Sequence, residues 1–137
     1  MNLSLVIPVY NEQDNLPLLL DAIYKTMHTL DRAWELILVD DGSRDNSLSI
    51  LKEYAEKDPE HIRVISFRRN FGQTAAIAAG LDYSQGEIIV LLDADLQNDP
   101  ADIPMMLAKL DEGYDLVSGW RKQRKDNAIT RNFPSML

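Results

Sequence analysis

Two aspartates, Asp93 and Asp95, follow an uninterrupted apolar run at residues 88–92. An apolar run without polar alternation is typical of a strand that is covered on both faces of a parallel sheet. Carboxylates two residues apart in an extended chain point the same way and lie roughly 6–7 Å apart. A cation between them, or a raised pKa of one of them, relieves their repulsion. The pair could therefore hold a divalent metal ion that carries a phosphorylated ligand, or it could be two solvated acids before a helix that begins near Pro100.

The rest of the chain alternates segments with strand and helix patterns, which implies a parallel sheet with right-handed crossovers. Strands are expected at residues 3–9, 34–40, 61–67, 87–92 and 115–118, and helices at about 16–30, 45–58, 74–80 and 103–110. Asn15 is expected to cap the first helix. The strand at 61–67 alternates more than the others and is expected nearer the sheet edge. The alanine-rich helix at 74–80 is expected to pack closely on a flat surface.

Polar residues follow four of the expected strands at the point where each strand ends. They stand at residues 8–12, 40–43, 68–70 and 93–95. In open α/β sheets, ligands bind beyond the carboxyl ends of the strands, and these four polar ends meet at that rim. The sequence therefore predicts one ligand site at the rim, to which Asp93 and Asp95 belong.

The composition limits the class of protein. The chain has 137 residues, of which 45% are hydrophobic and 26% charged, and this favours one domain with a core. The absence of cysteine excludes a disulfide scaffold and a thiolate metal site. No apolar run reaches the roughly 18–20 residues of a transmembrane helix, and the first expected strand leaves no room for a signal peptide. The segment itself is expected to be soluble.

The charge is distributed unevenly along the chain. Residues 1–118 have a net charge of −12 and residues 119–137 one of +4, which together give the net charge of −8. The acidic body argues against general nucleic-acid binding. The basic end suits an anionic ligand or an anionic membrane surface, or else is a solvated tail.

Four motifs along the chain carry a family resemblance. They are Val-Ile-Pro-Val-Tyr-Asn-Glu at 6–12, Val-Asp-Asp-Gly-Ser at 39–43, Arg-Asn-Phe-Gly-Gln at 69–73 and Leu-Asp-Ala-Asp-Leu-Gln at 92–97. In this order and spacing the chain resembles a family 2 glycosyltransferase with the GT-A fold that binds nucleotide-diphospho-sugars. The resemblance implies an α/β, Rossmann-like three-layer sandwich with a mostly parallel central sheet. It implies a GT-A core at residues 1–120 and, at 121–137, the basic start of a truncated acceptor or membrane-proximal region.

Further motifs resemble one branch of that family. Asn-Asp-Pro at 98–100, Gly-Trp-Arg at 119–121 and Thr-Arg-Asn-Phe-Pro-Ser at 130–135 are similar to those of the polyprenyl-phosphate branch, which includes dolichyl-phosphate mannose synthases and bacterial glucosyl relatives. This implies a nucleotide-sugar donor, with UDP-glucose favoured over GDP-mannose, a Mg²⁺ or Mn²⁺ ion and a polyprenyl-phosphate acceptor. It also implies action at the cytoplasmic face of the plasma or endoplasmic reticulum membrane. The oligomeric state is left open.

The resemblance also implies roles for single residues. The metal ligands are expected to be Asp93, Asp95 and Gln97. The nucleotide-sugar is expected to meet Pro8, Tyr10, Glu12, Asp40, Asp41, Asn70, Gly72, Gln73, Asp93 and Ala94. The catalytic residues are expected to be Asp95, Gln97, Arg121 and Arg131. The two arginines are expected to bind the acceptor phosphate or the donor's pyrophosphate. Alternatively, they are surface residues of a solvated basic tail.

The expected reaction is a direct displacement with inversion at the anomeric carbon. A hard cation on oxygen ligands stabilises the charge of a departing diphosphate. A phosphate acceptor, with a second pKa of about 6, is already anionic and needs cations rather than a base. Three alternatives remain: a transferase of the same fold with a hydroxyl acceptor, an inactive nucleotide-sugar-binding fragment, and a flavodoxin-like receiver domain. The receiver domain leaves Asp93 and Asp95 unexplained.

Overall fold

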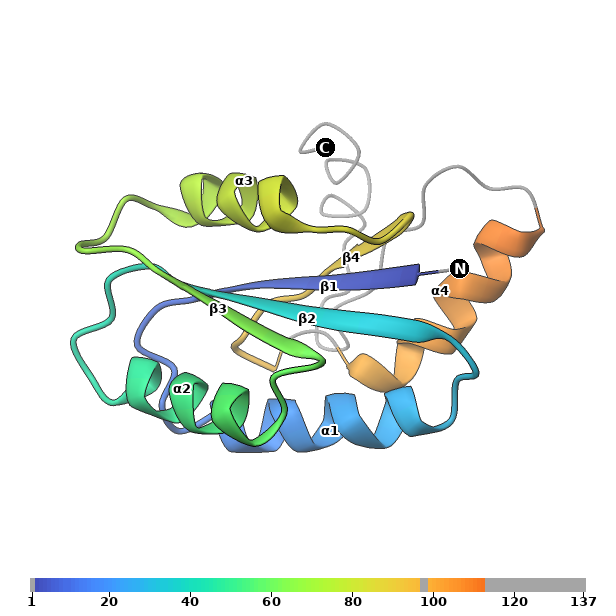
Figure 1. Cartoon of the computed structure of the whole chain (residues 1–137), viewed down its shortest axis with the longest axis horizontal. Coiled ribbons are helices and arrows are strands. Elements are labelled where there is room, and N and C mark those ends of the chain that lie inside the picture. The colour runs from blue at the N-terminus through green and yellow to red at the C-terminus, as the bar shows by residue number, and fades with distance from the viewer. Residues whose placement is uncertain (1, 97–98, 113–137) are drawn as a thin grey trace, which may run out of the picture.

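The computed structural model describes residues 2–96 and 99–112, which form an α/β domain (Figure 1). The strands are β1 (Asn2–Val9), β2 (Ala33–Asp40), β3 (Ile62–Ser66) and β4 (Ile88–Leu91). The helices are α1 (Leu16–His28), α2 (Ser47–Lys57), α3 (Gln73–Tyr83), the short 3-10 helix η1 (Pro100–Asp102) and α4 (Ile103–Asp111). All pairings in the sheet are parallel, and the strand order is β3-β2-β1-β4. The strand expected at 115–118 lies outside the described residues.

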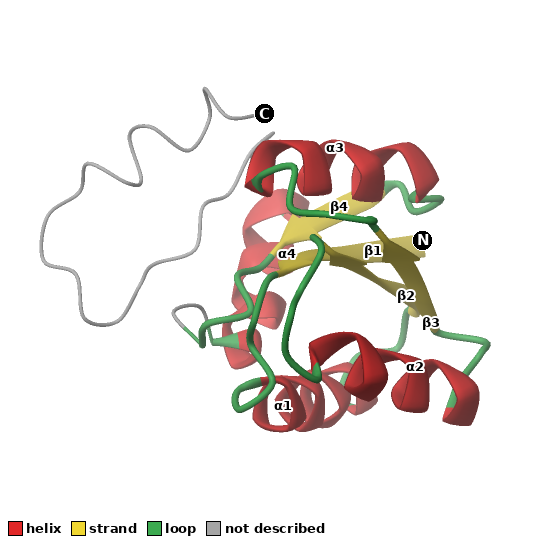
Figure 2. Ribbon diagram, turned by 90° about the vertical axis from the view of Figure 1, so that its left-hand side faces the viewer, coloured by secondary structure: helices red, strands yellow, loops and turns green. Residues whose placement is uncertain are grey.

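The sheet lies between two helical layers, as predicted. Helix α3 covers one face, and α1 and α2 cover the other (Figures 1 and 2). Along β2, Leu36 and Leu38 point into the larger core beneath α1, whereas Ile37 and Val39 point into a smaller core beneath α3. Because both faces of the central strands are buried, their sequences show no polar alternation. Within the described ranges, no helix is long and apolar enough to cross a membrane.

Helix α3 approaches the sheet closely, as its small residues predict. Ala76 is fully buried, and a Cβ atom added to Gly80 would lie 2.4 Å from Cγ1 of Val6. A side chain at position 80 would therefore push α3 away from β1.

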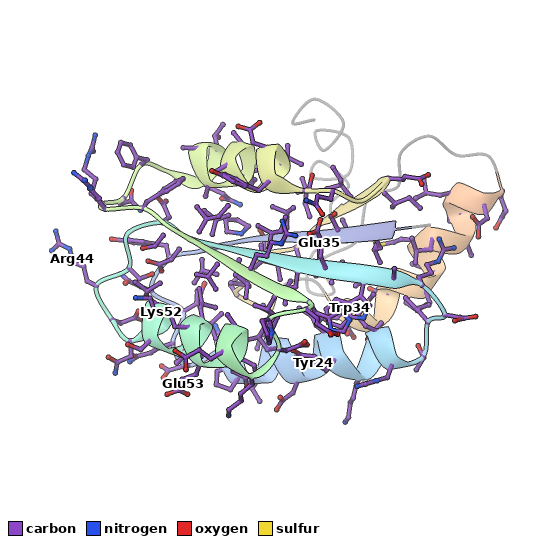
Figure 3. The ribbon with its side chains drawn as sticks, viewed as in Figure 1. Tyr24, Trp34, Glu35, Arg44, Lys52 and Glu53 are labelled. Carbon is purple, nitrogen blue, oxygen red and sulfur yellow. The ribbon has the colours of Figure 1, made fainter. Side chains whose placement is uncertain are left out.

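The segment between α3 and β4 is hydrogen-bonded to residues near the starts of β1 and β2. Glu35, labelled in Figure 3, accepts hydrogen bonds at Oε2 from Ser4 Oγ and from the Gln85 backbone N–H, both at 2.6 Å. Ser4 Oγ also accepts from the Gly86 N–H at 2.8 Å. Ser4 is fully buried, so this network fixes the register in which β4 enters the sheet.

An aromatic cluster lies at the amino-terminal ends of β2 and β3, at the opposite end of the sheet from the pocket rim. Trp34 stacks on His61 with ring centroids 4.1 Å apart and meets Tyr24 edge-on at 5.7 Å (Figure 3). The Tyr24 hydroxyl donates to Asp58 Oδ2 at 2.7 Å, and His61 Nδ1 lies 3.0 Å from the same oxygen. The cluster ties α1 to the turn between α2 and β3.

Three details differ from the sequence prediction. The Asn15 side chain does not cap α1: the backbone at Asn15 is already helical, and the side-chain Nδ2 donates to Glu12 Oε1 at 2.9 Å. Helix α2 begins at Ser47 rather than near Asp45, whose carboxylate accepts a hydrogen bond from the Ser47 N–H.

Strand β4 is shorter than predicted and, among the described residues, pairs only with β1. Ile89 is 41% exposed, so the prediction that this strand is covered on both faces is wrong at that residue. Strand β3 lies at the sheet edge, as predicted.

Candidate functional site

An open pocket lies where β1, β2 and β4 end. It is lined by Pro8, Val9, Tyr10, Glu12, Asp41, Gln73, Asp93, Ala94 and Asp95. Eight of these nine residues were predicted individually to bind the nucleotide-sugar or the metal, and Val9 was predicted only as part of the rim segment at residues 8–12. The structure therefore brings together polar groups from three separate strand ends and from the start of α3, at the rim where parallel α/β sheets bind ligands.

The predicted residues Asp40, Asn70 and Gly72 do not line this pocket. The Asp40 side chain lies on the same side of β2 as Leu36 and Leu38 and is 1% exposed. Its Oδ2 accepts from the Ser43 N–H at 3.3 Å, and its Oδ1 has no hydrogen-bond partner among the described residues. Of the two adjacent aspartates, Asp41 is the one that reaches the pocket.

Asp41 also anchors the segment that leads into α3. Asp41 is 3% exposed, and its carboxylate accepts hydrogen bonds from the N–H of Phe71 at 2.8 Å and of Gly72 at 3.1 Å. The Asn70 side chain donates to Asp41 Oδ2 at 3.1 Å. Gly72 has a φ of 108° and immediately precedes α3. Asn70 and Gly72 therefore support the pocket through Asp41.

The segments that follow β1 and β2 are joined by hydrogen bonds, in which side chains of each segment accept from backbone N–H groups of the other. Asn11 has a φ of 53°, and its Oδ1 accepts from the Arg44 N–H at 2.8 Å. Ser43 Oγ accepts from the Asn11 N–H, and Ser47 Oγ accepts from the Glu12 N–H, both at 2.9 Å. These contacts hold the backbone on either side of Tyr10 and Glu12. Asn11 and Ser43 lie in the rim segments predicted at residues 8–12 and 40–43, but no role was predicted for either of them or for Ser47. Short polar side chains in loops are typical of such bonds.

Asp93 and Asp95 lie on the pocket with different exposure. Asp95 is exposed and Asp93 half-buried, and the Gln73 Nε2 donates to Asp93 Oδ1 at 3.3 Å. Across residues 2–96 and 99–112, no group of three or more acids and histidines could hold a metal ion. Mg²⁺ is commonly bound by one or two carboxylates together with substrate phosphates and water. The two carboxylates therefore fit a cation that is shared with a diphosphate. Gln97, Arg121 and Arg131 lie outside the described residues, and their roles stay predictions.

The sequence model of glycosyl transferase family 2 matches residues 4–136, so the chain belongs to that family. It is similar to an undecaprenyl-phosphate 4-deoxy-4-formamido-L-arabinose transferase of Klebsiella pneumoniae, with 46% identity over 98% of this chain and 41% of the relative. It is also similar to a dodecaprenyl-phosphate galacturonate synthase of Rhizobium johnstonii, with 44% identity over 98% of this chain and 40% of that protein. These relatives confirm the predicted resemblance to the polyprenyl-phosphate branch. The chain spans about 40% of their length.

Solved structures of similar fold confirm the GT-A fold class. Staphylococcus aureus TarS in complex with UDP matches 82% of this chain and 32% of that chain, with a TM-score of 0.67 and 26% identity. A mannosyltransferase of Pyrobaculum calidifontis in complex with GDP-mannose and Mn²⁺ matches 68% of this chain and 27% of that chain, with a TM-score of 0.55 and 25% identity.

Proposed function

We propose that this chain is the donor-binding part of an enzyme that transfers a sugar from a nucleotide-diphospho-sugar to a polyprenyl phosphate. The observation that carries the proposal is the pocket that Asp93 and Asp95 line together with Asp41, Tyr10 and Glu12. A pocket lined by carboxylates, an amide and an aromatic ring suits a ligand that carries a metal-bound diphosphate and a base. The names of the relatives supply the acceptor class.

Asp93 and Asp95 would hold Mg²⁺ or Mn²⁺, which when bound stabilises the negative charge of a leaving diphosphate as a Lewis acid. Tyr10, Glu12 and Asp41 would orient the nucleoside, since the interlocked loops and the buried Asp41 give these groups fixed positions. Rigid placement of the donor lowers the entropic barrier to its reaction with the acceptor.

The chemical step would be a single displacement. An oxygen of the acceptor phosphate forms a bond to the anomeric carbon while the bond from that carbon to the diphosphate breaks, and the electron pair leaves with the diphosphate. No proton has to be removed, because a phosphate monoester with a second pKa of about 6 is already anionic. Within the proposal, Arg121 and Arg131 in the basic region 121–137 meet the acceptor phosphate or the donor's pyrophosphate, and this region leads to the cytoplasmic face of a membrane.

The donor is proposed to be a UDP-sugar. The resemblance to the branch favours UDP-glucose, and the solved TarS complex with UDP supports the uridine base. The relatives are named for formamido-arabinose and galacturonate, which makes the corresponding UDP-sugars the first competitors of UDP-glucose.

A transfer assay tests the proposal. Protein that carries this chain is incubated with each UDP-sugar or with GDP-mannose, with undecaprenyl phosphate or a hydroxyl acceptor, and the product's anomeric configuration is read by NMR. The proposal predicts a sugar-phosphate-lipid product of inverted configuration from a UDP-sugar. A retained configuration would exclude the single displacement, and transfer only to the hydroxyl acceptor would favour another branch of the family.

A further inference from the structure

Gln73 connects two sides of the pocket. It is the first residue of α3, it lines the pocket, and its side-chain Nε2 donates to Asp93 Oδ1 at 3.3 Å. The contact joins the start of a helix on one face of the sheet to the loop after β4. Sequence resemblance assigned Gln73 to the nucleotide-sugar itself, whereas the observed partner is a carboxylate that would bind the metal.

The backbone of Gln73 is fixed from two directions. Upstream, Asp41 accepts the N–H groups of Phe71 and Gly72, which sets where α3 begins. Downstream, α3 rests on the sheet through the buried Ala76 and through Gly80, where the close approach of Val6 leaves no room for a side chain. These contacts fix where α3 begins and how closely it packs on the sheet, so the backbone of Gln73 has a set position from which its exposed side chain reaches Asp93.

The chemistry of the amide suits a helper of a metal ligand. A neutral N–H donor occupies one carboxylate oxygen and fixes the rotamer without cancelling the negative charge that attracts a cation. A lysine at the same position would also donate, but its charge would compete with the cation. Partners that hydrogen-bond a metal ligand commonly change metal affinity by about 10–100-fold when removed.

We propose that Gln73 is a positioning residue that orients the Asp93 carboxylate for the divalent cation, and that Asp41 sets its place through the start of α3. This inference rests on the proposed function, because it assumes that Asp93 binds the cation. It assigns to Gln73 a contact with the metal ligand rather than with the nucleotide.

Calorimetric titration of UDP into the 137-residue chain, with Mn²⁺ and with a chelator, tests the inference. The measured quantity is the factor by which Mn²⁺ tightens UDP binding. Gln73→Met, which keeps the length of the side chain and removes the donor, should reduce this factor only about fivefold, because the contact is exposed and longer than an ideal bond. UDP affinity in chelator should be unchanged. Gln73→Lys should reduce the factor further and tighten UDP binding in chelator, because the ammonium group replaces part of the cation's charge. Gln85→Met, the same change just beyond the other end of α3, is the matched control and should behave as the wild type.

The outcomes separate this inference from the proposed function. A Gln73→Met variant whose Mn²⁺ factor stays within twofold of the wild type, while Asp93→Asn loses it, would overturn the positioning role alone. Weaker UDP binding by Gln73→Met in chelator, with an unchanged Mn²⁺ factor, would also overturn it and assign Gln73 to the nucleotide. A wild-type chain that binds UDP equally with Mn²⁺ and chelator would overturn the metal part of the proposed function and this inference together.

Discussion

Replacing Asp41 by asparagine should destabilise the fold although the two side chains have the same shape. Asp41 is 3% exposed, and its carboxylate accepts from three donors: the Phe71 N–H at 2.8 Å, the Gly72 N–H at 3.1 Å and the Asn70 amide at 3.1 Å. An asparagine presents one oxygen to these donors and turns its own NH₂ group toward at least one of them. Hydrogen bonds to a charged group contribute about 1.5–3 kcal/mol each. The loss of one or two of them should lower the free energy of unfolding by about 3 kcal/mol.

Urea denaturation followed by circular dichroism measures this loss. With a urea dependence of about 1.5 kcal/mol per molar, a loss of about 3 kcal/mol moves the midpoint down by about 2 M. Asp14→Asn is the matched control, because Asp14 is exposed on the loop before α1 and its change should stay within about 0.5 kcal/mol. An Asp41→Asn variant with the midpoint of the control would refute the role of Asp41 as the anchor of the segment before α3.

Two further predictions concern the turn after β2 and the far end of the sheet. Gly42→Ala should lower the free energy of unfolding by more than about 2 kcal/mol, because Gly42 has a φ of 71° and a Cβ there would lie 2.2 Å from the carbonyl carbon of Arg69. A variant with the urea midpoint of the wild type would contradict this prediction. Burial of Asp58 raises its pKa, but hydrogen bonds from Tyr24 and His61 and the charge of His61 outweigh burial and hold the pKa below the ordinary 3.8. A carboxyl whose pKa is lower in the folded state stabilises the fold above pH 3.8, and this stabilisation is lost as the pH falls through the folded-state pKa. The free energy of unfolding of the wild type should therefore drop more steeply below about pH 4 than that of Asp58→Asn. Equal slopes in urea unfolding between pH 5 and 2.5 would count against this coupling.

The layers and the pocket could be predicted because their signals are local in the sequence. Apolar runs at β1 and β2 indicate strands with two covered faces, and the rule that parallel sheets bind ligands at the carboxyl ends places their polar ends together. The small residues of α3 indicate that this helix packs closely on the sheet, because larger side chains would hold the two apart.

Other features are decided by the conformation of the folded backbone and left no such signal. Asn15 is a residue type that commonly caps helices, but its backbone is already helical in the folded loop, and its side chain donates to Glu12 instead. Asp40 and Asp41 are adjacent and identical in type, yet strand alternation turns one into the core and the other to the pocket. The exposure of Ile89 follows from the position of β4 in the described sheet, which composition does not reveal.

The central claim is that Asp93 and Asp95 bind a cation that a nucleoside diphosphate shares. Titration of UDP into the wild-type chain and into Asp93→Asn, each with Mn²⁺ and with chelator, tests it most directly. Asp99→Asn is the control, because Asp99 caps η1 through the Ala101 N–H and asparagine caps equally well. The claim predicts that Mn²⁺ tightens UDP binding by the wild type and the control at least about tenfold, which corresponds to about 1.4 kcal/mol, and has little effect on Asp93→Asn. UDP binding that is indifferent both to the chelator and to Asp93→Asn would contradict it.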